Sequence, residues 1–137
     1  MQWFTTCRGC GLGMLGRPGR AFCSNACQRS AEQRRLVDRW LSTGEGGPDS
    51  RHAHYIRTYL AAAQEGCCAV CGMTSEWQGK PLVFVLDHID GNADNNARSN
   101  LQMVCPNCDS QLATYKSRNR GKGRHFRRQR YADGQSY

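Results

Sequence analysis

The sequence lacks the features that would place a protein in a membrane or outside the cell. No apolar run approaches the ~20 residues that a membrane-spanning helix needs. The N-terminus, MQWFTTCRGCGLG, has no basic segment followed by an apolar one, which is the pattern of a secretory signal. The 137 residues suffice for one modest domain or two very small ones. We therefore expect a cytoplasmic protein with no membrane partner.

Disulfide bonds are a poor explanation for the nine cysteines, because the number is odd and secretion is not expected. Eight of them form four close pairs, each with two or three residues between its members. A tight turn that supplies two thiolates is half of a tetrahedral zinc site. The spacing therefore predicts two structural zinc sites of four cysteines each, with Cys67 left over. The expected ligands are Cys7, Cys10, Cys23 and Cys27 in one site, and Cys68, Cys71, Cys105 and Cys108 in the other.

Residues 1–41 are expected to form a first domain, a zinc-ribbon or treble-clef-like knuckle followed by a helix. GLGMLGRPGR, between the first two cysteine pairs, is too rich in glycine to build a core, so the metal must supply the folding energy. In SAEQRRLVDRWL, Ser30 and Gln33 fit a capping box, and Trp40 lies on the apolar face of the predicted helix. STGEGGPDS, residues 42–50, has the composition of a linker.

Residues 51–137 are expected to form a second domain, and the predicted fold class is a small, zinc-stabilised α+β protein. The third cysteine pair precedes its two strands, and the fourth pair stands where the second strand meets the last helix. The predicted elements are a helix over 51–66, a strand over 81–89, a loop over 90–100, a strand over 101–105, and a helix that starts at Pro106.

Positive charge gathers at the two ends of the chain. Residues 111–137 carry eight Lys or Arg against one acid, residues 1–40 have a net charge of +5, and residues 41–110 have −4. This pattern favours phosphate binding at the ends and cation binding in the middle. Because the tail also contains aromatic residues, we expect nucleic-acid binding rather than a merely solvated end, with Asn119 either contacting DNA or capping a helix. The expected contacts are Lys116, Arg118, Asn119, Arg120, Lys122, Arg124, Arg127 and Arg128.

Four segments together carry a resemblance to a known family: VLDHIDGN, SNLQMVCPNCDSQ, YKSRNRGKGR and, upstream, FCSNACQR. They resemble the HNH endonucleases, also called ββα-metal or His-Me finger nucleases. The zinc-bracketed subgroup is similar in having CxxC before the motif His and again just ahead of the last motif residue. With the Trp40 helix and the IRTYL helix, nearly the whole chain looks like the small phage HNH proteins that add an N-terminal zinc knuckle. The resemblance implies a ββα-metal nuclease domain working in a bacterial or phage-infected cell.

The resemblance assigns the chemistry to four residues. His88 would be the general base, and Asp87 would bind a catalytic Mg²⁺ or Mn²⁺. Asn100 would hold the loop that carries the His. Asp109 departs from the family, which most often has His or Asn there as second metal ligand; a carboxylate still suits a hard cation, and the alternative is a decayed site. Because strand neighbours point to opposite faces, we expect a distorted strand end that turns Asp87 and His88 toward one cleft.

The sequence thus predicts a metal-dependent endonuclease that hydrolyses phosphodiester bonds of double-stranded DNA, by a nick or a double-strand cut. One alternative is a non-catalytic zinc DNA-binding module, in which His88 is only a packed side chain. Another is an accessory nuclease that acts only with a partner, such as phage packaging machinery. The set of Asp87, His88, Asn100 and Asp109 favours the enzyme, because a pure binding module does not need it. No oligomeric state is predicted.

Overall fold

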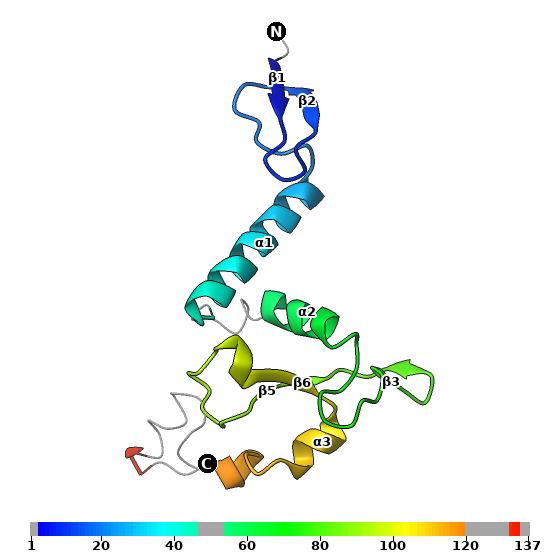
Figure 1. Ribbon diagram of the computed structural model, residues 1–137, viewed down its shortest axis with the longest axis vertical. Helices are drawn as coiled ribbons and strands as arrows, with labels where there is room; N and C mark the ends of the chain where they lie inside the picture. The colour runs from blue at the N-terminus through cyan, green and yellow to red at the C-terminus, as the bar shows by residue number, and fades with distance from the viewer. Residues whose placement is uncertain (1–2, 47–53, 120–131, 135–137) are drawn as a thin grey trace. The chain divides into compact units, whose positions relative to one another are not determined.

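The computed structural model describes residues 3–46, 54–119 and 132–134, and the chain divides into two compact units, Met1–Arg39 and Trp40–Tyr137 (Figure 1). Each unit combines helix with strand, as expected of a small mixed α/β protein. The predicted domain limits, 1–41 and 51–137, stay a prediction, and residues 47–50 of the predicted linker lie outside the described residues. No helix within the described ranges is long and apolar enough to span a membrane.

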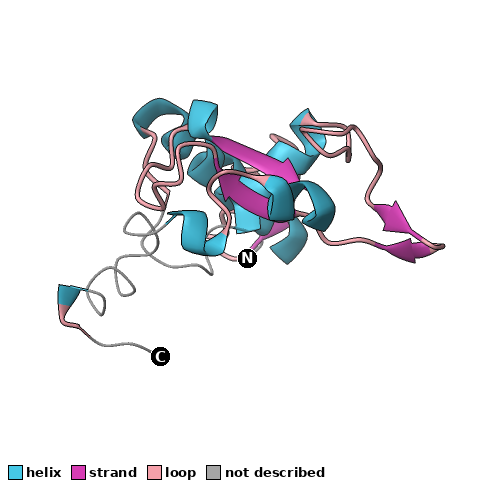
Figure 2. Ribbon diagram, turned by 90° about the horizontal axis from the view of Figure 1, so that it is seen from below, coloured by secondary structure: helices cyan, strands magenta, loops and turns pink. Residues whose placement is uncertain are grey.

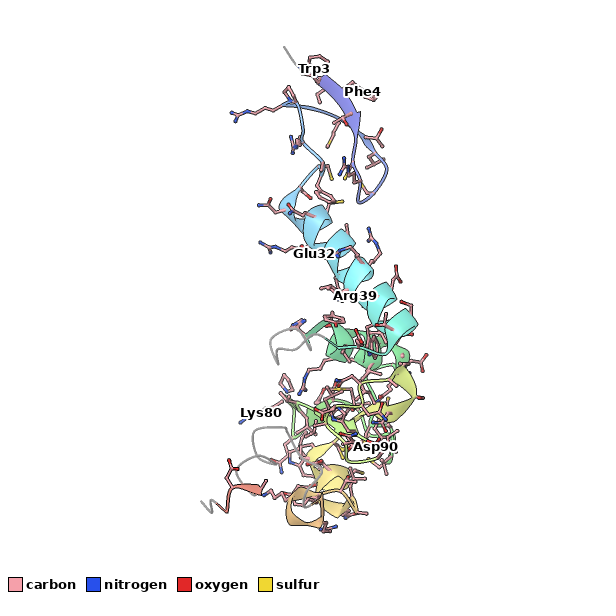
Figure 3. The ribbon with its side chains drawn as sticks, turned by 90° about the vertical axis from the view of Figure 1, so that its left-hand side faces the viewer. Trp3, Phe4, Glu32, Arg39, Lys80 and Asp90 are labelled. Carbon is pink, nitrogen blue, oxygen red and sulfur yellow. The ribbon has the colours of Figure 1, made fainter. Side chains whose placement is uncertain are left out.

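The first unit consists of a β-hairpin that leads into a long helix. Strand β1 (Trp3–Thr6) pairs antiparallel with β2 (Gly13–Gly16), and the aromatic side chains of Trp3 and Phe4 on β1 are exposed (Figure 3). Few side chains are buried here, and Cys7 and Met14 are the main ones. So small a core agrees with a unit that depends on its cysteines for stability.

Helix α1 (Asn25–Thr43) starts earlier than the sequence predicted. Ser24 Oγ accepts a hydrogen bond from the backbone N–H of Cys27 at 3.1 Å, which is the bond that an N-capping serine makes. The predicted start at Ser30 and its capping box is therefore wrong. Ser24 caps the helix instead, and the first turn of α1 thereby carries Cys27 toward the other cysteines of its set.

The second unit is built around a pair of short strands. Strand β5 (Val85–His88) pairs antiparallel with β6 (Leu101–Val104). Helix α2 (His54–Ala63) packs against β6, and helix α3 (Pro106–Gln111) against β5 (Figures 1 and 2). A separate hairpin is formed by β3 (Glu76–Trp77) and β4 (Lys80–Pro81). The 3-10 turn η2 (Arg98–Asn100) precedes β6, and the 3-10 turn η3 (Lys116–Asn119) follows α3.

The core of the second unit is small and includes the last turn of α1. Trp40 is fully buried, and its ring meets Tyr59 of α2 edge-on, with ring centroids 5.4 Å apart. Leu60, Leu101 and Val104 are equally well buried. Trp40 therefore joins α2 and the strands in one apolar cluster, which the sequence indicated only as an apolar helix face.

Three of the predicted elements can be compared residue by residue with the structure. The strand predicted over 81–89 is shorter, because Pro81 belongs to the β3–β4 hairpin and only Val85–His88 pair with β6. The strand predicted from Leu101 and the helix start at Pro106 are confirmed. Pro106 fits the first turn because its missing N–H has no partner to lose there.

Candidate metal centres and active site

Two sets of four cysteines bring their sulfur atoms together, and they are the sets that the spacing predicted. Within each set the Sγ atoms all lie within 4.8 Å of one another. Cys7 and Cys27 Sγ are 3.5 Å apart in the first set, and Cys71 and Cys105 Sγ are 3.8 Å apart in the second. Four sulfurs placed tetrahedrally about 2.3 Å from Zn²⁺ are about 3.8 Å apart. Both sets therefore fit a structural zinc ion.

In each set, backbone N–H groups favour the thiolate form of one cysteine, and thiolate is the form that binds a metal ion. Backbone N–H groups, that of Cys10 foremost, lower the pKa of Cys7 to about 6. Burial alone would raise the pKa of Cys68, but N–H groups from its own turn and from Cys105 outweigh it and lower that pKa to about 6. The thiols of Cys27 and Cys108 have pKa values raised to about 12, because they share hydrogen bonds with neighbouring sulfurs. Zinc would replace these shared protons.

The ninth cysteine stays apart from both sets. Cys67 Sγ lies 3.6 Å from the backbone oxygen of Glu65, and all nine cysteines are free of disulfides. The sequence left Cys67 over for the same reason, since Cys68 has the two-residue gap to Cys71. The second set is thus a closed group of four thiols with no open position for substrate.

The second cysteine set also fixes where Asp109 lies. Cys105 is the N-cap of α3, and its Sγ accepts from the backbone N–H of Cys108 at 3.4 Å. The N–H of Asp109 donates to the carbonyl oxygen of Cys105 at 2.9 Å, so Asp109 lies in the first turn of α3. The carboxylate of Asp109 therefore directly follows Cys108, in a helical turn whose position the cysteines fix.

Asp87 and Asp109 are near neighbours, because α3 packs against β5. Burial raises the pKa of the Asp109 carboxyl, and the charge of Asp87 raises it further, while Lys116 opposes both effects. Asp87 is buried, and its Oδ2 accepts from Gln102 Nε2 at 2.8 Å, directly across the β5–β6 pair. Two neighbouring carboxylates repel each other, and a bound cation removes that repulsion. The pair offers oxygen ligands to a hard cation such as Mg²⁺ or Mn²⁺.

His88, the next residue after Asp87, has different surroundings. Its half-buried ring places Nε2 3.0 Å from Asn96 Oδ1. The β5–β6 pairs follow one another without interruption from Val85 to His88, so the distorted strand end that we expected is wrong; the bond between Asp87 and Gln102 supports this regular register. Among the residues that the structure describes, only the cysteines form close clusters of three or more possible metal ligands, so His88 does not join Asp87 and Asp109 in one.

The loop between the strands, residues 90–100, is held by Asn100. Its buried side chain donates from Nδ2 to Asp90 Oδ1 and to the carbonyl oxygen of Asn95, both at 2.8 Å, and accepts from the Asp90 N–H at 3.0 Å. Asp90, labelled in Figure 3, also accepts from Asn95 Nδ2 and from the N–H of Asn92. These bonds, that from Asn95 first, lower the pKa of Asp90. Asp90 is thus a turn-forming residue.

Part of the predicted DNA-binding set lies in η3, just after α3, and Lys116 there is close enough to Asp109 to lower the pKa of that carboxyl. Lys116 and Arg118 lie over the ring of Tyr115, at 4.9 Å and 5.7 Å from its centroid. Arg118 also donates to the carbonyl oxygens of Leu112 and Ser110, so part of its guanidinium satisfies backbone acceptors at the C-terminal end of α3. Asn119 is the last residue of η3. The other predicted contacts lie outside the described residues: Arg120, Lys122, Arg124, Arg127 and Arg128.

Two residues of the site were missed by the sequence reasoning. Gln102 contacts Asp87 because it is the partner of Asp87 in the strand pair, so a correct strand register would have found it. Asn96 contacts His88, but it is one of four asparagines in the loop, and nothing in the sequence separates it from the others. Only the folded loop identifies it.

The fold and the site together define a small mixed α/β protein with two zinc-compatible sets of four cysteines and two neighbouring carboxylates, one of which directly precedes a histidine in the chain. In a comparison with curated proteins, 55 residues of the chain are 42% identical to the H-N-H endonuclease F-TflIV of Escherichia phage T5. The match covers 40% of this chain and 24% of the length of the phage protein. No protein-family model and no solved structure matches the chain. The match supports the resemblance to HNH endonucleases at the level of the family.

Proposed function

We propose that this protein is a metal-dependent HNH endonuclease that hydrolyses phosphodiester bonds in double-stranded DNA. The observation that carries the proposal is the pair of neighbouring carboxylates, Asp87 at the end of β5 and Asp109 in the first turn of α3, with His88 directly after Asp87 in the chain. The partial match to a phage H-N-H endonuclease supports it. Under this proposal residues 51–137 form a ββα-metal domain, and residues 1–41 form a treble-clef-like zinc knuckle that extends the DNA contact or positions a partner.

Each residue of the proposed active site has a separate role in hydrolysis. His88 takes a proton from the attacking water. Asp87 and Asp109 would hold one Mg²⁺ or Mn²⁺, and such an ion would neutralise charge that develops on the phosphate and on the departing 3′ oxygen. Asn100 keeps the loop after His88 in shape through its bonds to Asp90 and Asn95. Gln102 fixes the orientation of the Asp87 carboxylate through its hydrogen bond to Oδ2.

The charges near the site suit a phosphate backbone. Lys116 lies close enough to Asp109 for each to affect the pKa of the other. The Lys116 ammonium is therefore a positive charge near the carboxylate of Asp109. An ammonium there attracts a phosphate that approaches the cation. The basic residues of the tail, from Arg120 onward, would continue the contact along the DNA. The charge pattern, like the resemblance to HNH endonucleases, therefore supports DNA as the substrate class.

The proposal is tested with zinc-loaded protein and an end-labelled DNA duplex, with Mg²⁺ or Mn²⁺ added to metal-depleted buffer. We expect cleavage that requires the added ion and products with 5′-phosphate and 3′-hydroxyl ends, as the resemblance implies. DNA binding without cleavage would favour the zinc DNA-binding module. Cleavage that appears only when a phage packaging protein is added would support the accessory nuclease.

Replacing Asp109 by alanine is expected to slow cleavage about 100-fold or more, because a cation that loses a carboxylate ligand gives up several kcal/mol of charge stabilisation. The zinc content should stay at two ions, since Cys105 and Cys108 are untouched. Cleavage rates and zinc content are measured on the same preparation. The control is Ser110→Ala, which changes the next residue, whose hydroxyl only donates within α3. Unchanged cleavage by the Asp109 variant would contradict the assignment of this carboxylate as a metal ligand.

A further inference from the structure

The hydrogen bond between Asn96 and His88 determines which imidazole nitrogen carries a proton. Asn96 Oδ1 lies 3.0 Å from His88 Nε2. An amide oxygen can only accept, so in a neutral ring the proton is on Nε2 and the lone pair is on Nδ1. Within the described part of the chain, Nδ1 of His88 has no hydrogen-bond partner. The ring is therefore presented with its basic nitrogen free.

The backbone of Asn96 is held by the end of helix α1. Trp40 is fully buried, and its indole Nε1 donates to the carbonyl oxygen of Asn96 at 2.6 Å. The ring of Trp40 is itself fixed against Tyr59. A buried indole N–H without an acceptor is costly, so this bond ties the position of Asn96 to the apolar core.

The chain just after α1 packs against the same stretch of the loop. A Cβ added at Gly46 would come within 3.4 Å of Asn96 Cγ, and one added at Gly44 within 3.6 Å of Ala97 Cα. On the other side of the loop, the carbonyl oxygen of Asn95 accepts from Asn100 Nδ2. Asn96 is thus held through its own backbone, its side-chain neighbours and the residue before it, although it lies in a loop rich in polar residues.

We propose that Asn96 is the positioning residue of His88, and that Trp40 holds Asn96 in place for this purpose. The inference rests on the proposed nuclease function and deepens it by naming the nitrogen that acts. Water gives its proton to Nδ1 while Nε2–H stays bonded to Asn96. The hydroxide oxygen bonds to phosphorus, the bond from phosphorus to the 3′ oxygen breaks, and that oxygen takes a proton from solvent.

The tautomer can be measured without any cleavage. Long-range ¹H–¹⁵N NMR spectra of the zinc-loaded protein, taken where the imidazole is neutral, should show His88 with its proton on Nε2. The signals are assigned by their loss in His88→Ala. Asn96→Ala should give a mixture of tautomers, whereas Asn92→Ala, which alters the same loop away from His88, should keep the wild-type form. A proton on Nδ1 in the wild type, or an unaltered tautomer in Asn96→Ala, would overturn the proposal.

Kinetics supply the second test. Asn96→Ala should lower kcat about 100-fold with little change in KM, because a misplaced catalytic group costs that much. Asn96→Asp keeps an acceptor oxygen and should restore most of the activity where the imidazole is neutral. Trp40→Phe, which removes the indole N–H donor together with part of the buried ring, should lower kcat in the same direction. Equal losses in Asn96→Ala and Asn92→Ala would mean a merely structural role and would overturn the proposal.

The two measurements separate this inference from the proposed function. If the wild-type protein cuts no DNA under any condition, the nuclease proposal fails, and the NMR experiment still decides whether Asn96 fixes the tautomer of His88. Zinc content and thermal melting of each variant show whether it has folded. A Trp40→Phe protein that does not fold is replaced by Gly46→Val, which crowds the side chain of Asn96 directly and should shift the tautomer mixture likewise.

Discussion

Replacing Cys105 by alanine is expected to unfold the second unit, the largest effect on stability that we foresee. Structural zinc sites of this kind contribute about 10–16 kcal/mol of apparent binding free energy, which is as large as the whole stability of a typical domain, about 5–15 kcal/mol. The apolar core of Trp40, Leu60, Leu101 and Val104 is too small to replace that contribution. Cys105 is also buried and caps α3, so its loss removes a ligand and a helix cap at once.

Native mass spectrometry and circular dichroism measure the effect. The wild-type protein should hold two zinc ions and the Cys105 variant one, with the melting transition of the second unit lost. Cys67→Ser is the matched control, because Cys67 belongs to neither set and should leave two ions bound. A Cys105 variant that kept both zinc ions and the wild-type melting curve would contradict the assignment of this cysteine set.

Replacing His88 by alanine is expected to lower the rate of DNA cleavage by about 10²–10⁴-fold, the usual contribution of a general base. The fold should survive, because His88 is only half-buried at the end of β5 and, within the described residues, its side chain is hydrogen-bonded to Asn96 alone. DNA affinity should also survive, since the basic residues and the carboxylate pair are unchanged. The variant therefore separates the enzyme from a DNA-binding module.

The rate of duplex cleavage is measured at saturating Mg²⁺ or Mn²⁺, and DNA binding by gel shift with the same preparations. His54→Ala is the matched control: His54 is exposed at the start of α2, and its ring faces Thr58. We expect it to cleave at the wild-type rate. If His54→Ala and His88→Ala slowed cleavage equally, the role of His88 as base would have to be abandoned.

The cysteine sets, the strand from Leu101 and the helix start at Pro106 followed from the sequence because the deciding interactions are local. Two thiols with two or three residues between them can bind the same metal ion from one tight turn, so the spacing alone predicted both sets. Pro106 next to Cys105 similarly indicated the start of α3. The start of α1 was missed because two serines had suitable positions, and the choice of Ser24 over Ser30 depends on where Cys27 must lie.

The support around His88 could not be read from the sequence, because it depends on contacts between distant segments. The bond from Trp40 to Asn96 joins residues 56 positions apart, and the loop asparagines look alike until the chain is folded. The expected strand distortion failed for the same reason: the regular pair of Asp87 with Gln102 became visible only once the register was known. Local spacing identifies metal ligands, whereas the orientation of a catalytic side chain depends on tertiary packing.

The central claim is that the group of His88, Asp87 and Asp109 hydrolyses DNA, and plasmid nicking tests it most directly. Zinc-loaded wild-type protein and His88→Ala are incubated with supercoiled plasmid and Mg²⁺ or Mn²⁺, at concentrations where gel shift shows equal DNA bound. We predict that the wild type converts the plasmid to nicked or linear forms and that the variant leaves it supercoiled. Equal nicking by both proteins, or an inert wild type that binds DNA and holds both zinc ions, would contradict the account.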